Sequence, residues 1–571
     1  MTALDWVVLA GTLGFIAVYG AWKSRDVRDI DGYLRGGNTL AWPTIGLSIM
    51  ATQASAITFL STPGQAYQDG MRFVQFYFGL PLAMIVIAAV FVPIFHRLKV
   101  YTAYEYLEHR FDGRVRTLGA LLFLIQRGLA AGITIYAPSI ILSTVLGWPL
   151  HLTNFVLGLF VVAYTVSGGT RAVSQTQKQQ MIVMLSGMAV AGIVILFNLP
   201  ESVSLPHAVK LAGALDRMNP VSFQLDFKSR YNFWSGIAGG FFLALAYFGT
   251  DQSQVGRYLA GRSVAESRLG LVFNGLFKIP MQFGILFIGV LVFVFYLFTP
   301  PPIFFNAAAL ERAARGPYAG QLAALEERYD AAFTAQREAT DAYLDALSCG
   351  AGQEPARALL RDAFAETQQL RQEAKDLVAR AVPGAETKDA DYVFISFVLR
   401  YLPSGIVGLL IAVILCAAMS SVASELAALG STSVIDLYKR FGPAAARGYA
   451  PRTDLLVSRA FTVLWGCVAV GFATFASLLD NLIQAVNILG SIFYGTVLGL
   501  FVVAFFLRRI TATPVLIGAL VAQATVIALF LASDLGFLWY NVVGCGLVVA
   551  VSAVLQALGA GSTPRAGAPS H

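Results

Sequence analysis

Long apolar stretches recur along nearly the whole chain and are separated by short polar connections. Stretches such as DWVVLAGTLGFIAVYGAW and PLAMIVIAAVFVPIF approach the roughly 20 apolar residues that a helix needs to cross a hydrocarbon core of about 30 Å. Helices are expected because unpaired backbone groups are costly in lipid. The pattern predicts an all-α, polytopic membrane protein with about thirteen transmembrane helices, near residues 4–22, 41–61, 73–95, 117–146, 150–167, 178–198, 233–256, 270–298, 400–430, 453–475, 480–507, 513–533 and 537–559.

Small and polar residues interrupt two of these spans. The second, TIGLSIMATQASAITFLSTPGQAYQDG, contains Pro63, and we expect its helix to break over residues 51–55. The seventh, GIAGGFFLALAYFGTDQSQVGRYLAG, has a matching irregularity. An odd number of spans separates the two, so they enter the membrane from opposite sides, as in a 5+5 inverted repeat whose broken helices meet at a central site. A helix kinked by Pro63 without ion binding is the alternative for the second span alone.

Residues 305–390 depart from the apolar pattern. They are rich in Ala, Glu, Arg and Gln at helical spacing, with the turn SCGAGQEP in the middle, which predicts an antiparallel helical hairpin. This insertion is either a solvated decoration or a surface for a protein partner. It separates residues 1–304 (a peripheral first span, the first repeat and the start of the second) from residues 391–559 (the rest of the second repeat and peripheral C-terminal spans), and residues 560–571 are expected to form a disordered cytoplasmic tail.

Composition and charge support a membrane protein and give it an orientation. Apolar residues make up 57% of the chain and charged residues 13%. Basic residues fall on alternate connections, including HRLKVYTAYEYLEHRFDGRVR and YKRFGPAAARGYAPR, which we expect to face the cytoplasm. The N-terminus and the hairpin then lie outside a plasma (inner) membrane, and the C-terminus lies inside. The net charge of +7 is assigned to these loops and not to a nucleic-acid partner. The first span is expected to be a retained anchor, because MTALDW is not a basic n-region and no clear small-residue cleavage site follows it.

The ninth span, within LCAAMSSVASELAALGSTSVIDLYKR, carries a line of hydroxyl groups and one carboxylate. At 100° per residue, one stripe of this helix holds Ala417, Ser420, Ser421, Ser424 and Ser431, with Glu425 at its flank. A monovalent cation needs several oxygens to replace its water, and the free carbonyls of a broken helix supply them. Serines that let helices pack closely are the alternative interpretation.

Three motifs resemble signatures of one transporter family. AYTVSGGTRAVSQTQKQQ resembles the glycine-pair signature of the sodium:solute symporters, GTDQSQVGRYLAGRSVAESR is similar to their seventh-span exit, and AAMSSVASELAALGSTSVIDLYKR to their ion-binding helix. The resemblance covers about residues 4–535 apart from the hairpin. It implies a leucine-transporter-type fold and sodium-coupled import of a small polar organic solute by alternating access, without enzymatic activity.

The resemblance also implies a sodium site. The family's conserved ion would be bound by the backbone carbonyls of Ala51, Ala54 and Ala417 and by the hydroxyls of Ser420 and Ser421.

Some members of the family bind a second sodium ion through an aspartate after the glycine pair and two further serines. The matching positions here are Gln177, Ala423 and Ser424. Because the aspartate is missing, we expect one sodium ion per transport cycle.

Charged residues inside the spans are costly in lipid and are functional candidates for that reason. Charge balance predicts an intramembrane pair between Arg127 and Glu425, and a pairing of Lys278 with Asp251 or with the solute. In sugar-carrying relatives the equivalent of Lys278 lies near the substrate. The full set of expected solute-binding residues is Gln53, Phe76, Tyr77, Gln126, Tyr247, Asp251, Lys278 and Asn487.

The solute itself is less defined. Tyr77 and Ala244 stand where sugar-carrying relatives have a glutamate and an asparagine, which weakens a sugar assignment. If Arg127 and Lys278 are paired internally, the solute should be neutral or zwitterionic.

Two other functions compete with sodium symport as interpretations of the sequence. Proton coupling would use Glu425, because an embedded carboxylate can carry a proton. A non-transporting solute sensor of the same fold would need a signalling module after the spans. The scattered histidines, and the spacing of Cys349, Cys416, Cys467 and Cys545, match no metal site or catalytic cluster.

Overall fold

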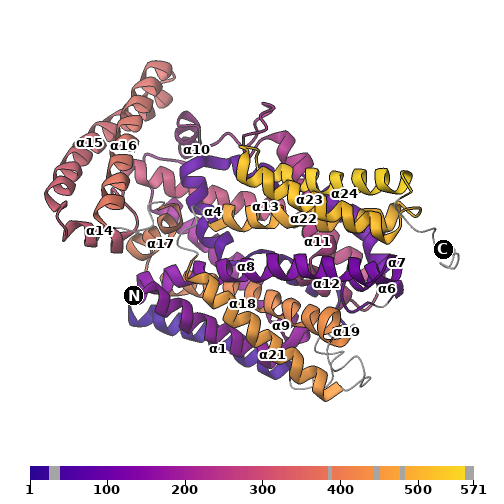
Figure 1. The fold of residues 1–571 in the computed structure, drawn as a ribbon. Helices are drawn as coiled ribbons and strands as arrows, with labels where there is room; N and C mark the ends of the chain where they lie inside the picture. The colour runs from indigo at the N-terminus through magenta and orange to yellow at the C-terminus, as the bar shows by residue number, and fades with distance from the viewer. Residues whose placement is uncertain (25–38, 99, 383–388, 442–450, 476–481, 560–571) are drawn as a thin grey trace.

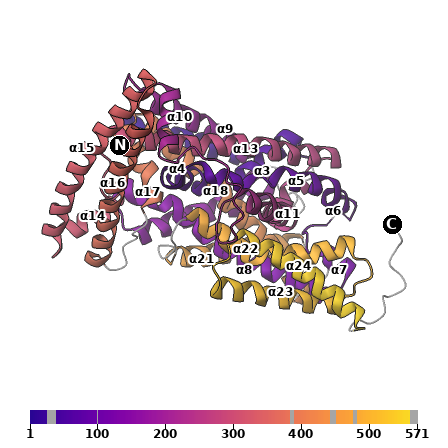
Figure 2. The ribbon, with the colours of Figure 1, turned by 90° about the horizontal axis from the view of Figure 1, so that it is seen from above.

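The computed structural model describes residues 1–24, 39–98, 100–382, 389–441, 451–475 and 482–559. Every regular element within these ranges is helical. Long helices run side by side, and two of them, α15 (Ala319–Cys349) and α16 (Gln353–Ala381), project at the end of the bundle where the N-terminus lies (Figure 1). The view from above shows the same arrangement, with α6 (Val92–Leu98) and α7 (Glu105–Arg110) at the opposite end (Figure 2).

The elements before the insertion include both broken helices. They are α1 (Ala3–Ser24), α3 (Trp42–Gln53), α4 (Ala56–Asp69), η2 (Gly70–Tyr77), α5 (Leu80–Val86), η3 (Ile87–Phe91), α6, α7, α8 (Gly113–Leu146), α9 (Leu150–Phe197), α10 (Leu205–Ala214), η4 (Ser235–Gly239), α11 (Gly240–Thr250), α12 (Gln252–Leu259) and α13 (Val264–Phe298).

The remaining elements begin with the insertion and end with the peripheral helices. They are α14 (Ala307–Ala314), α15, α16, α17 (Ala390–Tyr401), α18 (Ile406–Thr432), η5 (Ser433–Tyr438), α19 (Lys439–Phe441), α21 (Pro451–Ala473), α22 (Leu482–Phe506), α23 (Ala512–Ala532) and α24 (Leu538–Ala557).

Most of these helices have the length and composition of membrane spans. Among the described residues, 9 helical stretches are long and apolar enough to cross a membrane, and shorter apolar helices accompany them at Ala3–Ile16, Leu150–Val166 and Ser235–Thr250. The chain is therefore a multi-pass membrane protein, while the count of about thirteen spans stays a prediction. The expected disordered tail at 560–571 lies outside the described residues.

The two spans predicted at 150–167 and 178–198 both lie within one helical element, α9. Its backbone is helical throughout its 48 residues. The hydroxyls of Tyr164 and Thr176 nevertheless lie 2.7 Å apart. Twelve residues of a straight helix rise about 18 Å, so the two halves of α9 must bend towards each other between these residues. The sequence pattern located the two apolar halves but not the continuous helical connection.

The break between α3 and α4 falls inside the region predicted for it. Ala54 has ψ 79° and Ser55 has ψ 174°, so the chain leaves the helix for two residues. The amide of Ser55 donates to the carbonyl of Gln53 at 3.0 Å instead of to Ala51, its partner in a continuous helix. The carbonyl of Ala51 is thereby released for another donor.

A second break separates α11 from α12. Asp251 has extended backbone, and its carboxylate caps α12 by accepting from the amide of Ser253 at 2.9 Å. The hydroxyl of Tyr104 donates to the carbonyl of Thr250 at 2.9 Å. Side chains therefore satisfy the backbone groups that the break leaves without a helical partner, as a buried helix end requires.

The insertion packs onto α4, the second half of the first broken helix. Gly350 and Gly352 have φ of 71° in the turn between α15 and α16, a left-handed conformation that favours glycine. The buried guanidinium of Arg371 in α16 pairs with Asp389 at 2.8 Å. The Cζ atom of Arg371 lies 6.0 Å from the ring centre of Tyr67 in α4. Burial alone would raise the pKa of Asp389, but Arg371 and Lys375 outweigh it and lower that pKa.

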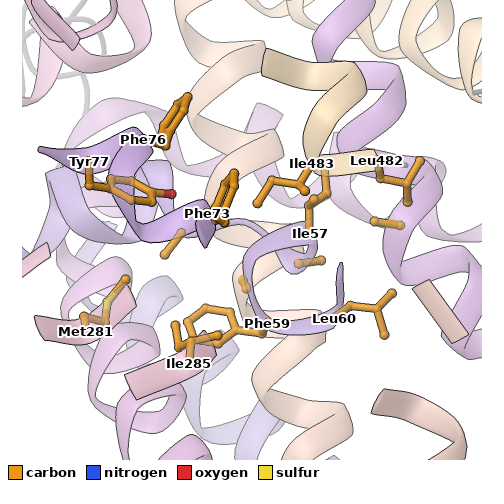
Figure 3. Packing of buried hydrophobic residues seen from close by; sticks show 14 of the residues in the cluster. Ile57, Phe59, Leu60, Phe73, Phe76, Tyr77, Met281, Ile285, Leu482 and Ile483 are labelled. Carbon is orange, nitrogen blue, oxygen red and sulfur yellow. The ribbon is translucent and has the colours of Figure 1, made fainter. Parts of the chain in front are cut away.

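Apolar side chains from α4, η2, α13 and α22 pack together around α4, the second half of the broken helix (Figure 3). Phe73 and Phe76 stack with ring centres 5.4 Å apart, and Tyr77 meets Phe76 edge-on at 4.9 Å. Close packing of α4 against α13 depends on Gly289, where an added Cβ would lie 2.2 Å from the carbonyl oxygen of Pro63.

We expect Gly289→Ala to lower the melting temperature of the purified protein, because overpacking a tight interface costs about 1–3 kcal/mol. Gly284→Ala in the same helix is the matched control, since nothing lies within 4 Å of its added Cβ. Thermal unfolding in detergent checks the pair. Equal melting temperatures for the two variants would contradict the close approach of α4 and α13.

Candidate ion and solute site

The hydroxyls of α18 face the break between α3 and α4. Ser420 Oγ donates to the carbonyl of Ala51 at 2.9 Å, and Ser421 Oγ donates to the carbonyl of Thr52 at 3.1 Å. All four residues are at most 3% exposed. The structure therefore brings the two serines and Ala51 together, as the sodium-site hypothesis requires.

The other two expected sodium ligands lie next to this contact. Ala54 is the residue at which α3 ends, and Ala417 lies one turn before Ser420 and Ser421 in α18. Both are fully buried. Thr52 was not expected from the sequence, although it sits inside the predicted interruption.

Gln177 fills the position next to the serines. Its Nε2 atom lies between 2.7 and 3.1 Å from four oxygens, which belong to Thr52, Ser420 (carbonyl and hydroxyl) and Ser424. Its Oε1 accepts from the hydroxyl of Ser48. A neutral amide nitrogen thus occupies the centre of an oxygen cluster.

A buried charge cluster lies beside the same segment of α18. Arg127 Nη1 donates to Glu425 at 3.1 Å, and Nη2 donates to Asp251 and to the hydroxyl of Tyr494. Tyr494 in turn donates to Asp251 at 2.9 Å. The expected contact between Arg127 and Glu425 is present, and Asp251 pairs with Arg127 instead of with Lys278.

A cavity of about 90 Å³ lies between the broken helix and α8, α11, α18 and α22. Most of its lining comes from polar and aromatic side chains. Of the expected solute-binding residues, those on its wall are Gln53, Phe76, Tyr77, Tyr247 and Asn487.

The three other expected solute-binding residues do not line this cavity. Asp251 lies behind Arg127. Gln126 donates to Tyr494 at 3.3 Å. Lys278 is fully buried in α13, with its Nζ 5.8 Å from the ring centre of Tyr77 and no hydrogen-bond partner in the described part of the chain. Lys278 therefore contacts a residue of the cavity wall, Tyr77, without lining the cavity itself.

Several cavity residues were missed. Arg127 and Glu425 were expected only as a charge pair, yet both reach the wall, together with Thr52, Ser55, Thr134 and Tyr494. Thr134 lies seven residues after Arg127, on the same face of a helix, and this spacing could have placed both at one site.

Membrane helices with two breaks, one of which meets a hydroxyl-lined helix beside a buried cavity, form the architecture of a secondary active transporter. The sodium:solute symporter family matches residues 33–315 and 371–522, so the chain belongs to this family. The match omits residues 316–370, which lie in the insertion.

Known proteins of this kind are similar to the chain over different lengths. The human sodium/iodide cotransporter is 37% identical over 273 residues, which is 47% of this chain and 41% of that protein. The human sodium-coupled monocarboxylate transporter 1 is 34% identical over 277 residues, 47% of this chain and 44% of that protein. The sodium/sialic acid symporter of Aliivibrio fischeri is 24% identical over 565 residues, 96% of this chain and 92% of that protein.

The fold also matches a solved structure. A Na⁺-coupled sialic acid symporter in a substrate-bound, outward-open state superposes with a TM-score of 0.75 at 22% identity, covering 98% of both chains. The likeness confirms the expected fold. The chain matches less than half of the length of the two human relatives, 41% and 44%.

We expect Arg127→Ala to cost about 3–5 kcal/mol of stability, because it leaves the buried carboxylates of Asp251 and Glu425 without their counter-charge. Arg328→Ala, which removes an exposed arginine paired with Glu373 at 3.3 Å, should cost at most about 1 kcal/mol. Denaturant or thermal unfolding of both variants measures the difference. A similar loss in the two would mean that the buried cluster contributes no more than a surface pair.

Proposed function

We propose that the protein imports a small polar organic solute together with sodium by alternating access. The observation that carries this proposal is the contact of Ser420 and Ser421 with the carbonyls released at the break after α3. Neutral oxygens from two helices suit a dehydrated monovalent cation that must also be able to leave. Family membership supports the same function.

In this mechanism sodium stabilises the state in which the broken helix and α18 are held together. An ion between them replaces the hydrogen bonds of the serines with bonds from both helices to one charge. One sodium ion that crosses 100 mV supplies about 2.3 kcal/mol, before its concentration gradient is added. Since about 1.4 kcal/mol maintains a tenfold ratio, one ion can support solute accumulation well above tenfold.

We propose one sodium ion per cycle. The Nε2 atom of Gln177 lies within 3.0 Å of hydroxyl oxygens of Thr52, Ser420 and Ser424 and has two hydrogens to donate among them, so a second cation there would lie against an amide donor. The missing carboxylate removes the charge that would repay dehydration of a second ion.

The charge pairing bears on the proton alternative and on the solute. Glu425 accepts from Arg127 at 3.1 Å, and the case for sodium over protons rests on the oxygens at Ser420 and Ser421. Arg127 is paired with two carboxylates and Lys278 does not line the cavity, so neither offers a free positive charge to the solute, and the proposed solute is neutral or zwitterionic. Uptake driven by a pH gradient alone, and lost in Glu425→Gln, would instead establish proton coupling.

The proposed location is the plasma (inner) membrane with the N-terminus outside. The N-terminal end of the bundle carries the insertion, and α19, with Lys439 and Arg440, lies away from it (Figure 1). An insertion outside the membrane could serve as a surface for a protein partner, and its packing onto α4 gives such a partner a route to the broken helix.

We expect Ser420→Ala and Ser421→Ala each to raise the half-maximal sodium concentration about tenfold, because a hydrogen-bond partner of a charged group is worth about 1.5–3 kcal/mol. The measurement is sodium-dependent thermal stabilisation of the purified protein, screened with and without a solute library. Ser431→Ala is the control, since among the described residues that hydroxyl donates to Ala428 of its own helix, at 2.9 Å. Unchanged sodium affinity in both site variants would rule out this ion site.

We expect the double variant Gln177→Asp, Ala423→Ser to gain a second sodium ion, because it restores the carboxylate and serine that two-sodium relatives carry. Sodium titrations of thermal stability should change from a Hill coefficient of about one towards two. Gln177→Asn, which keeps the amide, is the control and should stay near one. A coefficient already near two in the unmodified protein would overturn the one-ion proposal.

A further inference from the structure

The cavity wall holds a charged acceptor and a charged donor that are only partly used. Glu425 Oε1 accepts from Arg127, but Glu425 Oε2 and Arg127 Nε are buried and have no hydrogen-bond partner in the described residues. Both residues line the cavity. A buried charged atom without a partner is costly, so a ligand that satisfies both atoms would bind favourably.

The charged cluster at the cavity wall sets the net charge of that ligand. Within this cluster Arg127 carries one positive charge against the two negative charges of Asp251 and Glu425, which leaves one negative charge in excess, while Lys278 lies outside the cluster and does not line the cavity. The sodium ion proposed at Ser420 and Ser421, one helical turn from Glu425, cancels that excess. A solute of zero net charge then keeps the buried site neutral, which avoids the cost of an unpaired buried charge.

Aromatic rings favour a cation on one end of the solute. The cavity is lined by Phe76, Tyr77, Tyr247 and Tyr494. Aromatic faces attract ammonium groups. Arg127 already lies over Tyr247, 5.3 Å from its centre, which shows that this ring accepts a cation.

The size of the cavity limits the solute. Its volume of about 90 Å³ equals the liquid volume of about three water molecules, at roughly 30 Å³ each. A compound with the size of a small amino acid matches this volume, and a nine-carbon sugar acid exceeds it.

We propose that the cavity selects a small zwitterion, whose ammonium group donates to Oε2 of Glu425 and whose anionic group accepts from Nε of Arg127. The proposal rests on the proposed sodium-coupled transport and names the solute class of that site. Monocarboxylates lack the donor for Glu425, and simple amines lack the acceptor for Arg127.

Matched ligands test the class. Alanine, propionate and ethylamine share a carbon skeleton but carry both charged groups, only the carboxylate or only the ammonium. Glycine betaine and proline extend the zwitterion set with an alkylated ammonium. Thermal shifts of the purified full-length protein in saturating sodium should show binding of at least one zwitterion, with propionate and ethylamine at least tenfold weaker. Propionate binding as tight as that of every zwitterion, or no zwitterion binding, would overturn the proposal.

A variant tests the contact. Glu425→Gln removes the charge at similar shape, and it should weaken zwitterion binding at least tenfold while the sodium-induced shift remains. Glu108→Gln makes the same change in an ion pair with Arg116 outside the cavity and should leave ligand binding unchanged. Zwitterion binding that Glu425→Gln does not weaken would refute the contact.

The two proposals fail in different ways. Zwitterion binding that is independent of sodium would leave the solute class intact and refute sodium coupling. Sodium-dependent binding of propionate alone would leave the coupling intact and refute the solute class.

Discussion

The structure depends on how backbone groups are satisfied where a membrane helix is interrupted. In an apolar surrounding each unpaired carbonyl or amide costs several kcal/mol, so a break persists only where other groups take the place of the helical bonds. At the break after α3, the hydroxyls of Ser420 and Ser421 accomplish this for Ala51 and Thr52. The same carbonyls are available to an ion, so what stabilises the break without sodium also positions the oxygens that would bind it.

The charge cluster obeys a similar constraint. Arg127 is 3% exposed, and its charge is tolerable only because Asp251, Glu425 and Tyr494 converge on it from three other elements. These partners tie α8 to the second break, to α18 and to α22. A rearrangement of any of them changes the electrostatics of the cavity, which gives solute and conformation a physical means of influencing each other.

The amino-acid pattern predicted the parts that depend on local chemistry. Small and polar residues within an apolar run indicated the break near Ala54, and the spacing of Ser420 and Ser421 placed both hydroxyls on one face. Contacts that depend on how helices cross were not accessible. Nothing in the sequence showed that Asp251 would pair with Arg127, that Lys278 would lie against Tyr77 outside the cavity lining, or that Gln177 would reach four oxygens on two helices. The apolar pattern of α9 predicted two spans, and it did not show that a continuous helical backbone connects them.

The arrangement of α18 suggests why sodium and solute would be coupled. Ser421 and Glu425 are four residues apart, so their side chains lie one above the other on the same helix face. Ser421 contacts the broken helix. Glu425 lines the cavity and pairs with Arg127, which also pairs with Asp251. An ion that draws α3 onto α18 therefore fixes the position of Glu425 relative to Gln53 and Ser55, which line the cavity from the break itself. One rigid helical turn, about 5.4 Å long, links the ion site to the solute cavity. Coupling between ion binding and solute binding therefore requires only this direct connection.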